Sequence, residues 1–109
     1  MSLQGFCSAV LECYQALPDT PNRSSRYDRS LAEAWFHRQI PLSQIQAAFA
    51  LALLRRHLRA NTTPPLQPIR SLHYFVPLLD ELSQQDPRYV DYCRFRAHRL
   101  FPDISFLQL

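Results

Sequence analysis

The sequence predicts an all-α protein: a single compact bundle of about five helices around a central apolar helix at about residues 41–60. Three observations support this prediction. First, 47% of the 109 residues are apolar, which is typical of a globular chain. Second, apolar residues recur at helical spacing in five separate segments, and no segment alternates as a half-buried strand does. Third, nine prolines and a single glycine disfavour tight β-hairpins and separate the helical segments.

The first two helices are predicted from apolar stripes bounded by proline and serine. The first helix covers about residues 2–17 and ends at Pro18, which cannot continue a helix. The second begins near Ser24 or Ser25, because either serine is a suitable N-cap. Its expected buried residues are Tyr27, Leu31, Ala34 and Trp35.

The third helix is expected to be the centre of the domain. Pro41 suits its first position, where the missing N–H costs nothing, and the helix is expected to continue to about Ala60. Apolar residues lie on two opposite sides of this helix, so neighbouring helices must surround it. The proline-rich residues 61–68 that follow are the one clear linker.

Two more helices and a tail complete the prediction. The fourth helix covers about residues 69–83 and must be kinked or split by Pro77, which removes a helical hydrogen bond. The fifth begins with Asp86 as N-cap and Pro87 at its first position, and it continues to about Phe101.

The predicted domain organisation is a single helical domain at residues 1–102 and an apolar C-terminal tail at residues 103–109. Because the tail is unusually apolar for a chain end, we expect it to dock on the domain or on a partner.

The basic residues are the most informative part of the composition. All twelve are arginine, the formal net charge is +3, and no acidic residue occurs between Ala34 and Leu79. Each guanidinium group can bind a phosphate or a carboxylate through two hydrogen bonds. A concentrated positive field of this kind favours nucleic acid or an acidic partner.

Several classes of protein are disfavoured by simple features of the chain. The longest apolar run, Ala47 to Leu54, is much shorter than the ~20 residues needed to cross a bilayer. The first residues show no basic region ahead of an apolar stretch, so we expect no secretory signal and no membrane partner. Three cysteines without paired spacing indicate a reducing, cytoplasmic environment.

No constellation of residues predicts catalysis. The four histidines are far apart, and no cysteine or carboxylate accompanies them at the spacing of a metal site. A phosphate-binding glycine loop is excluded because Gly5 is the only glycine. We therefore expect a protein that is not an enzyme, with no metal, no cofactor and no small-molecule substrate.

Two arginine-rich surfaces are the candidate binding sites. The first consists of the end of the third helix and a residue beyond the linker, and its phosphate-contacting residues would be Arg55, Arg56, Arg59 and Arg70. The second is the outer face of the fifth helix, where arginine and aromatic residues share a narrow arc: Arg88, Tyr92, Phe95 and Arg99. Such a face suits base stacking or a protein hot spot. The alternative is that the apolar tail folds back over Tyr92 and Phe95.

One run of residues resembles known proteins. Residues 68–75 (Pro-Ile-Arg-Ser-Leu-His-Tyr-Phe), together with the helix start at residues 40–42 (Ile-Pro-Leu) and the arginine-rich end of that helix, resemble a pattern in small helical proteins of bacterial mobile elements. The region from Tyr27 to Leu82 also resembles the closing part of DnaD-like and plasmid replication-initiator helical domains. The resemblance implies a bacterial origin and work near DNA, in replication or element transfer.

Three functional hypotheses follow from the sequence. The leading one is a non-catalytic helical accessory protein of a bacterial mobile-element or replication system that binds nucleic acid through its arginines. The alternative is a protein-interaction subunit, either a homodimer or a small component of a larger assembly, that uses the helix at residues 86–101 and the tail at residues 103–109. The third is a helix-turn-helix regulator whose recognition helix would begin with Ser43, Gln44 and Gln46.

Overall fold

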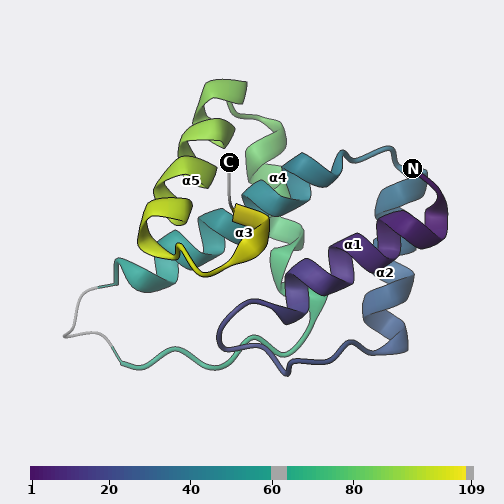
Figure 1. Ribbon diagram of the computed structural model, residues 1–109, viewed down its shortest axis with the longest axis horizontal. Coiled ribbons are helices and arrows are strands. Elements are labelled where there is room, and N and C mark those ends of the chain that lie inside the picture. The colour runs from purple at the N-terminus through teal and green to yellow at the C-terminus, as the bar shows by residue number, and fades with distance from the viewer. Residues whose placement is uncertain (60–63, 108–109) are drawn as a thin grey trace.

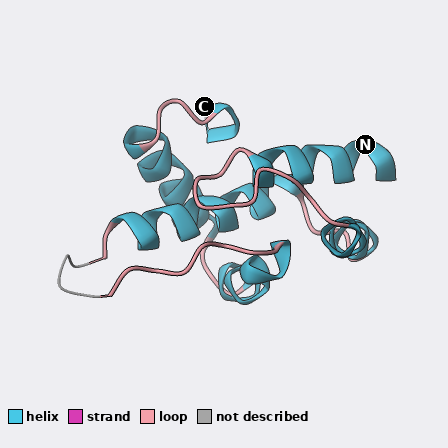
Figure 2. Ribbon diagram, turned by 90° about the horizontal axis from the view of Figure 1, so that it is seen from below, coloured by secondary structure: helices cyan, strands magenta, loops and turns pink. Residues whose placement is uncertain are grey.

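Five α-helices form the described part of the protein, as the sequence predicts, and two short 3-10 helices accompany them (Figures 1 and 2). The computed structural model describes residues 1–59 and 64–107, and these residues contain no strand. In chain order the elements are α1 (Leu3–Gln15), α2 (Arg26–His37), α3 (Leu42–His57), the 3-10 helix η1 (Leu72–Phe75), α4 (Val76–Ser83), α5 (Pro87–Leu100) and the 3-10 helix η2 (Ser105–Leu107).

The central position of α3 is confirmed. Every residue from Ala47 to Leu54 is buried, and Phe49 and Ala50 have no exposed surface. Helix α3 contacts α1, α4 and α5, whereas α2 packs on α1 (Figure 1). The radius of gyration of 13.5 Å is close to the ~13 Å expected for one domain of this length.

Three of the described α-helices begin with a residue whose side chain caps the first turn. Ser2 caps α1 by accepting a hydrogen bond from the Gly5 amide at 3.0 Å. Ser25, rather than Ser24, caps α2, and Asp86 caps α5 with Pro87 in its first position, as predicted. Pro41 precedes α3 in the N-cap position instead of being its first residue, so the prediction for this start is wrong by one residue.

The buried face of α2 differs from the prediction. Trp35 is buried, as predicted, but Tyr27 is 62% exposed and Ala34 is also exposed, whereas Asp28 and Ala32 are buried. The reason is the carboxylate of Asp28, which accepts hydrogen bonds from the Ser25 amide at 3.0 Å and from the Leu72 amide at 2.9 Å. A prediction that places every carboxylate in solvent therefore assigns part of the wrong face of α2 to the core.

The end of α2 is formed without glycine. The Ile40 amide donates to the Trp35 carbonyl at 3.1 Å and the Gln39 amide donates to the Phe36 carbonyl at 2.9 Å, which is the Schellman arrangement. Gln39 has a positive φ of 60°, the left-handed conformation that glycine normally supplies at this position. The turn therefore carries some backbone strain.

The predicted fourth helix is divided into two elements. Pro77 lies in the first turn of α4, where its missing N–H is tolerated, and the residues before it form η1. The predicted start at residue 69 is therefore wrong. Ile69 is buried but extended, and its amide donates to the carbonyl of Asp19 at 2.8 Å.

The end of α3 also differs from the prediction. The helix ends at His57, and the next residue, Leu58, is 61% exposed. The predicted end at Ala60 lies outside the described residues, as does the first part of the linker, residues 61–63. The described part of the linker, residues 64–68, is extended and exposed.

The C-terminal tail docks on the domain of its own chain. Leu107 has no exposed surface, and the ring of Phe106 lies 6.0 Å from the ring of Phe49 in α3. The 3-10 helix η2 contacts both α3 and α5. The sequence left open whether the tail docks on its own domain or on a partner, and for residues 103–107 the answer is its own domain. Residues 108–109 lie outside the described part of the chain.

Candidate protein-binding groove

Arg55, the first of the arginines predicted to contact phosphate, forms an ion pair inside the molecule. Its Nη1 donates to Oε2 of Glu81 in α4 at 2.8 Å, and its Nη2 contacts the other carboxylate oxygen. The hydrogen bonds to Glu81 raise the pKa of Arg55, and those same bonds hold the pKa of Glu81 below its usual value. Arg55 therefore connects α3 to α4 through a bidentate pair.

Arg56 and Arg59 attach loops to the end of α3. The Arg56 side chain is only 11% exposed, and its Nη2 donates to Oδ2 of Asp19 at 3.2 Å and to the carbonyl of Gln67 at 3.1 Å. Arg59 donates to the carbonyl of Pro64 at 2.8 Å. These two arginines hold the extended linker and the loop after α1 in place, so the predicted phosphate surface has a structural use.

The other predicted arginines are more accessible. Arg70 is exposed in the extended segment before η1. The Arg88 side chain is 92% exposed and pairs with Asp86, the N-cap of its own helix, at 3.1 Å. Arg99 is exposed, and its guanidinium lies 5.9 Å from the centre of the Phe95 ring.

The outer face of α5 is open to solvent. Tyr92 is 51% exposed and Phe95 is 45% exposed, so the alternative in which the tail covers these two rings is wrong. The tail packs against Phe49 instead. A cation also accompanies the Tyr92 ring, because the guanidinium of Arg96 lies 5.9 Å from its centre and donates to the Tyr92 hydroxyl at 3.1 Å.

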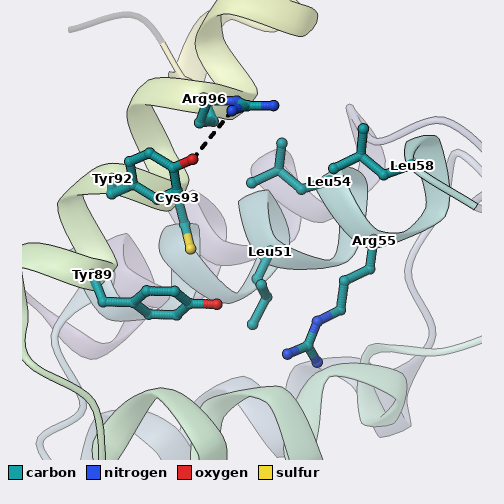
Figure 3. Close-up of a pocket in the computed structure, with 8 residues that line it drawn as sticks. All are labelled: Leu51, Leu54, Arg55, Leu58, Tyr89, Tyr92, Cys93 and Arg96. Atoms are coloured by element: carbon teal, nitrogen blue, oxygen red, sulfur yellow. Dashed lines mark hydrogen bonds between the residues drawn. The ribbon is translucent and has the colours of Figure 1, made fainter.

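Beside this face lies an open groove between α3 and α5, which we call the α3–α5 groove (Figure 3). Its volume is about 470 Å³. Residues at helical spacing on the two helices form its walls and floor: Leu51, Leu54, Arg55 and Leu58 from α3, and Tyr89, Tyr92, Cys93 and Arg96 from α5. No described residue of the tail lines it.

The groove has an apolar floor and two arginines, of which Arg55 is paired with Glu81. Leu51, Leu54 and Cys93 are almost fully buried at its base, whereas Tyr92 and Leu58 stand at its rims. In Figure 3 the guanidinium groups of Arg96 and Arg55 lie at opposite ends of the view. None of the eight lining residues is acidic.

Cys93 is suited to packing and not to nucleophilic attack. Burial is the main reason that the pKa of its thiol is raised, although the hydrogen bond with Tyr89 acts in the opposite direction. A thiol with a raised pKa is protonated at neutral pH and therefore unreactive. The floor of the groove thus behaves as an apolar surface.

Sequence reasoning found the outer face of α5 but missed the groove. Leu58, Tyr89 and Cys93 all belong to apolar stripes, and such stripes predict core residues and not the lining of a groove. Arg96 lies just outside the arc of Arg88 and Arg99, and its spacing of one helical turn from Tyr92 is the signal that could have identified it. The groove itself has no such signal, because it depends on how α3 and α5 pack against each other in the fold.

The predicted helix-turn-helix residues are only partly accessible. Ser43 is exposed, whereas Gln44 and Gln46 are half-buried. The side-chain amide of Gln46 lies 3.7 Å from the sulfur of Cys13 in α1, so it is directed toward the domain. Helix α3 therefore offers little of its surface to a DNA groove.

Comparison with known proteins adds no family to these observations. No protein-family model matches the chain, and neither a curated protein nor a solved structure matches it. Within the described residues, no three metal-ligating side chains come together. None of the described helices is long and apolar enough to span a membrane.

Proposed function

We propose that this protein is a non-catalytic protein-interaction subunit that binds its partner through the α3–α5 groove and the adjoining outer face of α5. The observation that carries the proposal is that Tyr92 and Phe95 remain exposed beside an open apolar groove while the chain's own tail is docked elsewhere. Exposed aromatic and apolar residues that gather beside a groove are typical of interaction sites.

The composition of this face supports the proposal. Tyrosine and arginine are the residues that most often contribute large binding energies at protein interfaces. Here Arg96 and Arg99 already lie against the rings of Tyr92 and Phe95, so less side-chain freedom is lost when a partner binds. An apolar groove flanked by such residues reproduces the apolar centre and polar rim of known interfaces.

Site-specific photocrosslinking in the native host tests the proposal. Benzoylphenylalanine placed at Phe95 should capture a defined partner protein, and the purified partner should bind the purified subunit. Tyr27 on α2 is the matched control, because it is an exposed aromatic residue on a different helix. Adducts that are absent at Phe95, or identical at both positions, would contradict a binding surface on α5.

Nucleic-acid binding is the second candidate function. The observation in its favour is the row of accessible arginines Arg88, Arg96 and Arg99, two of which lie on aromatic rings that could stack with bases. The resemblance of residues 68–75 to proteins of bacterial mobile elements and replication initiators points in the same direction, and it includes the exposed Arg70.

A salt titration tests this second candidate. If Arg70, Arg88 and Arg99 contact three phosphates of duplex DNA, log K should fall with log[salt] with a slope of about −2.7. Filter binding of labelled duplex and single-stranded oligonucleotides at several salt concentrations measures this slope. Undetectable binding at low salt would exclude the candidate.

A further inference from the structure

The residues that line the α3–α5 groove extend far enough along both helices to accommodate two turns of a third helix. Its walls are residues spaced three and four apart on both helices: Leu51, Leu54, Arg55 and Leu58 on one side, and Tyr89, Tyr92, Cys93 and Arg96 on the other. Each wall therefore extends for two helical turns, or roughly 10 Å. A helix lying in such a trough presents apolar anchors at i, i+3 or i+4, and i+7.

The charges around the groove favour an acidic occupant. Arg55 is already neutralised by Glu81, but within the described residues Arg96 forms no ion pair with a carboxylate. Arg99 lies one turn away on the outer face. Asp91, the acidic residue of α5, lines a different depression together with Pro41 and Leu82, and Asp103, four residues after Arg99, forms no ion pair with either arginine within the described residues. A carboxylate on the occupant would therefore be the first to pair with Arg96.

A second copy of this chain is a poorer occupant. A symmetric dimer buries the same patch of both copies, and because none of the groove-lining residues is acidic, the second copy's patch brings arginines but no carboxylate of its own to pair with Arg96. Like charges brought together at an interface disfavour association. Single-stranded nucleic acid fits less well for another reason: although Tyr89 and Tyr92 line the groove, its floor is formed by Leu51 and Leu54, whose aliphatic side chains cannot stack with bases.

We propose that the α3–α5 groove binds an acidic amphipathic helix of a partner protein, with leucine-like anchors on the apolar floor and a carboxylate against Arg96. This inference rests on the proposed protein-interaction function and adds the chemistry of the partner. The side chains that decide it are those of Leu58 and Tyr92, which contact the anchors, and Arg96, which selects the charge.

Fluorescence anisotropy with designed peptides tests the proposal. The probe is a fluorescein-labelled peptide of about 18 residues, long enough to form a helix, with leucines at i, i+4 and i+7 and glutamates beside them. One comparison peptide carries lysine in place of every glutamate, and another carries a central proline. The glutamate peptide should bind the full chain with micromolar affinity, and each comparison peptide should bind about tenfold more weakly or worse.

Variants of the protein locate the binding. Arg96→Glu should weaken binding of the glutamate peptide about tenfold and strengthen binding of the lysine peptide. Arg26→Glu is the matched control, because Arg26 also lies over a tyrosine ring, that of Tyr27 at 5.0 Å, but on α2. It changes the net charge equally and should leave the affinity almost unchanged. Leu58→Glu should also abolish binding, and it should fold because Leu58 is exposed.

The outcomes that overturn the proposal are distinct from those that overturn the proposed function. Equal binding of the glutamate and lysine peptides, retained binding of the proline peptide, or no binding of any peptide would each contradict an acidic helix. A concentration-dependent dimer in light scattering that Leu58→Glu abolishes would assign the groove to a second copy. In all these cases the crosslink at Phe95 still decides separately whether α5 contacts a partner protein.

Discussion

At the scale of single residues, Tyr14 carries a buried hydroxyl group that the fold does not use. Its ring packs against Phe75 with centroids 6.2 Å apart, but within the described residues its oxygen has no hydrogen-bond partner. Because an unpaired buried hydroxyl costs free energy, Tyr14→Phe should raise the free energy of unfolding by about 1 kcal/mol. Urea denaturation at neutral pH measures this change, and Tyr27→Phe, at an exposed position, is the control.

The same substitution should change the response to alkaline pH. Burial, with a further contribution from the charge of Asp28, raises the pKa of Tyr14 from 10.0 to about 12. The stability that depends on the neutral hydroxyl is therefore fully present below pH 10 and is lost as the pH rises toward 12. The advantage of Tyr14→Phe over the parent chain should widen across that interval. An advantage that stays constant above pH 10 would show that Tyr14 ionises equally easily in both states.

At the scale of elements, Asp28 joins two segments that are distant in sequence. Its carboxylate completes the capping box of α2 and also accepts the Leu72 amide at the start of η1. Asp28→Ala removes both acceptors and leaves a buried N–H unpaired, so it should lower the free energy of unfolding by about 3 kcal/mol. Asp28→Asn should cost less because it keeps one acceptor.

Two measurements check this role of Asp28. Urea denaturation gives the loss of stability, for which Asp91→Ala, at an exposed position on α5, is the control and should cost less than about 0.5 kcal/mol. Hydrogen exchange at the Leu72 amide should become much faster in Asp28→Ala while exchange in the middle of α3 changes only with global stability. Unchanged protection at Leu72 would contradict the proposed link.

The elements also show which parts of the fold the sequence could predict. Local signals were sufficient where a helix begins with its own cap, as at Asp86 and Pro87, or where apolar residues cover both sides of a helix, as in α3. They failed for the first turn of α2, where Asp28 rather than Tyr27 is buried, because the burial of Asp28 depends on an amide that lies 44 residues away. The sequence also predicts a break at Gln39 and Ile40, and the structure confirms it, although Gln39 stands where glycine normally ends a helix.

The candidate site follows the same division. The exposed face of α5 was predictable because it depends on the period of one helix. The ion pairs of Arg55 and Arg56 could not be predicted, because their partners Glu81 and Asp19 are 26 and 37 residues away in the sequence. An arginine with no acidic residue near it in the sequence can still pair with a distant carboxylate in the fold, and the amino-acid composition does not predict such pairs.

At the scale of the whole molecule, two arginines and the C-terminal tail attach other segments to α3 at different points along its length. Arg55 and Arg56 tie α4, the linker and the loop after α1 to the end of α3. The tail covers Phe49 near the middle of the same helix. Within the described residues, neither the tail nor the loops held by these arginines cover the outer face of α5 or the α3–α5 groove, so the proposed binding surface lies there.

The docked tail leads to a prediction about stability and assembly. Leu107 has no exposed surface, so Leu107→Ala should leave a cavity and lower the free energy of unfolding by about 3 kcal/mol. Because the tail docks on its own domain, this loss should be the same at all protein concentrations, and light scattering should give the same mass for the parent chain and the variant. Chemical denaturation at two widely separated protein concentrations measures the loss of stability and shows whether it depends on concentration.

A chain that ends at Pro102 extends this test to the entire tail. It should be destabilised at least as much as Leu107→Ala, because it also loses the contact between Phe106 and Phe49. Leu66→Ala, at a partly exposed position in the linker, is the control and should have little effect. If the shortened chain kept its stability but lost a dimeric mass, the tail would act between two copies, and the protein-interaction surface would have to be moved from the groove to the tail.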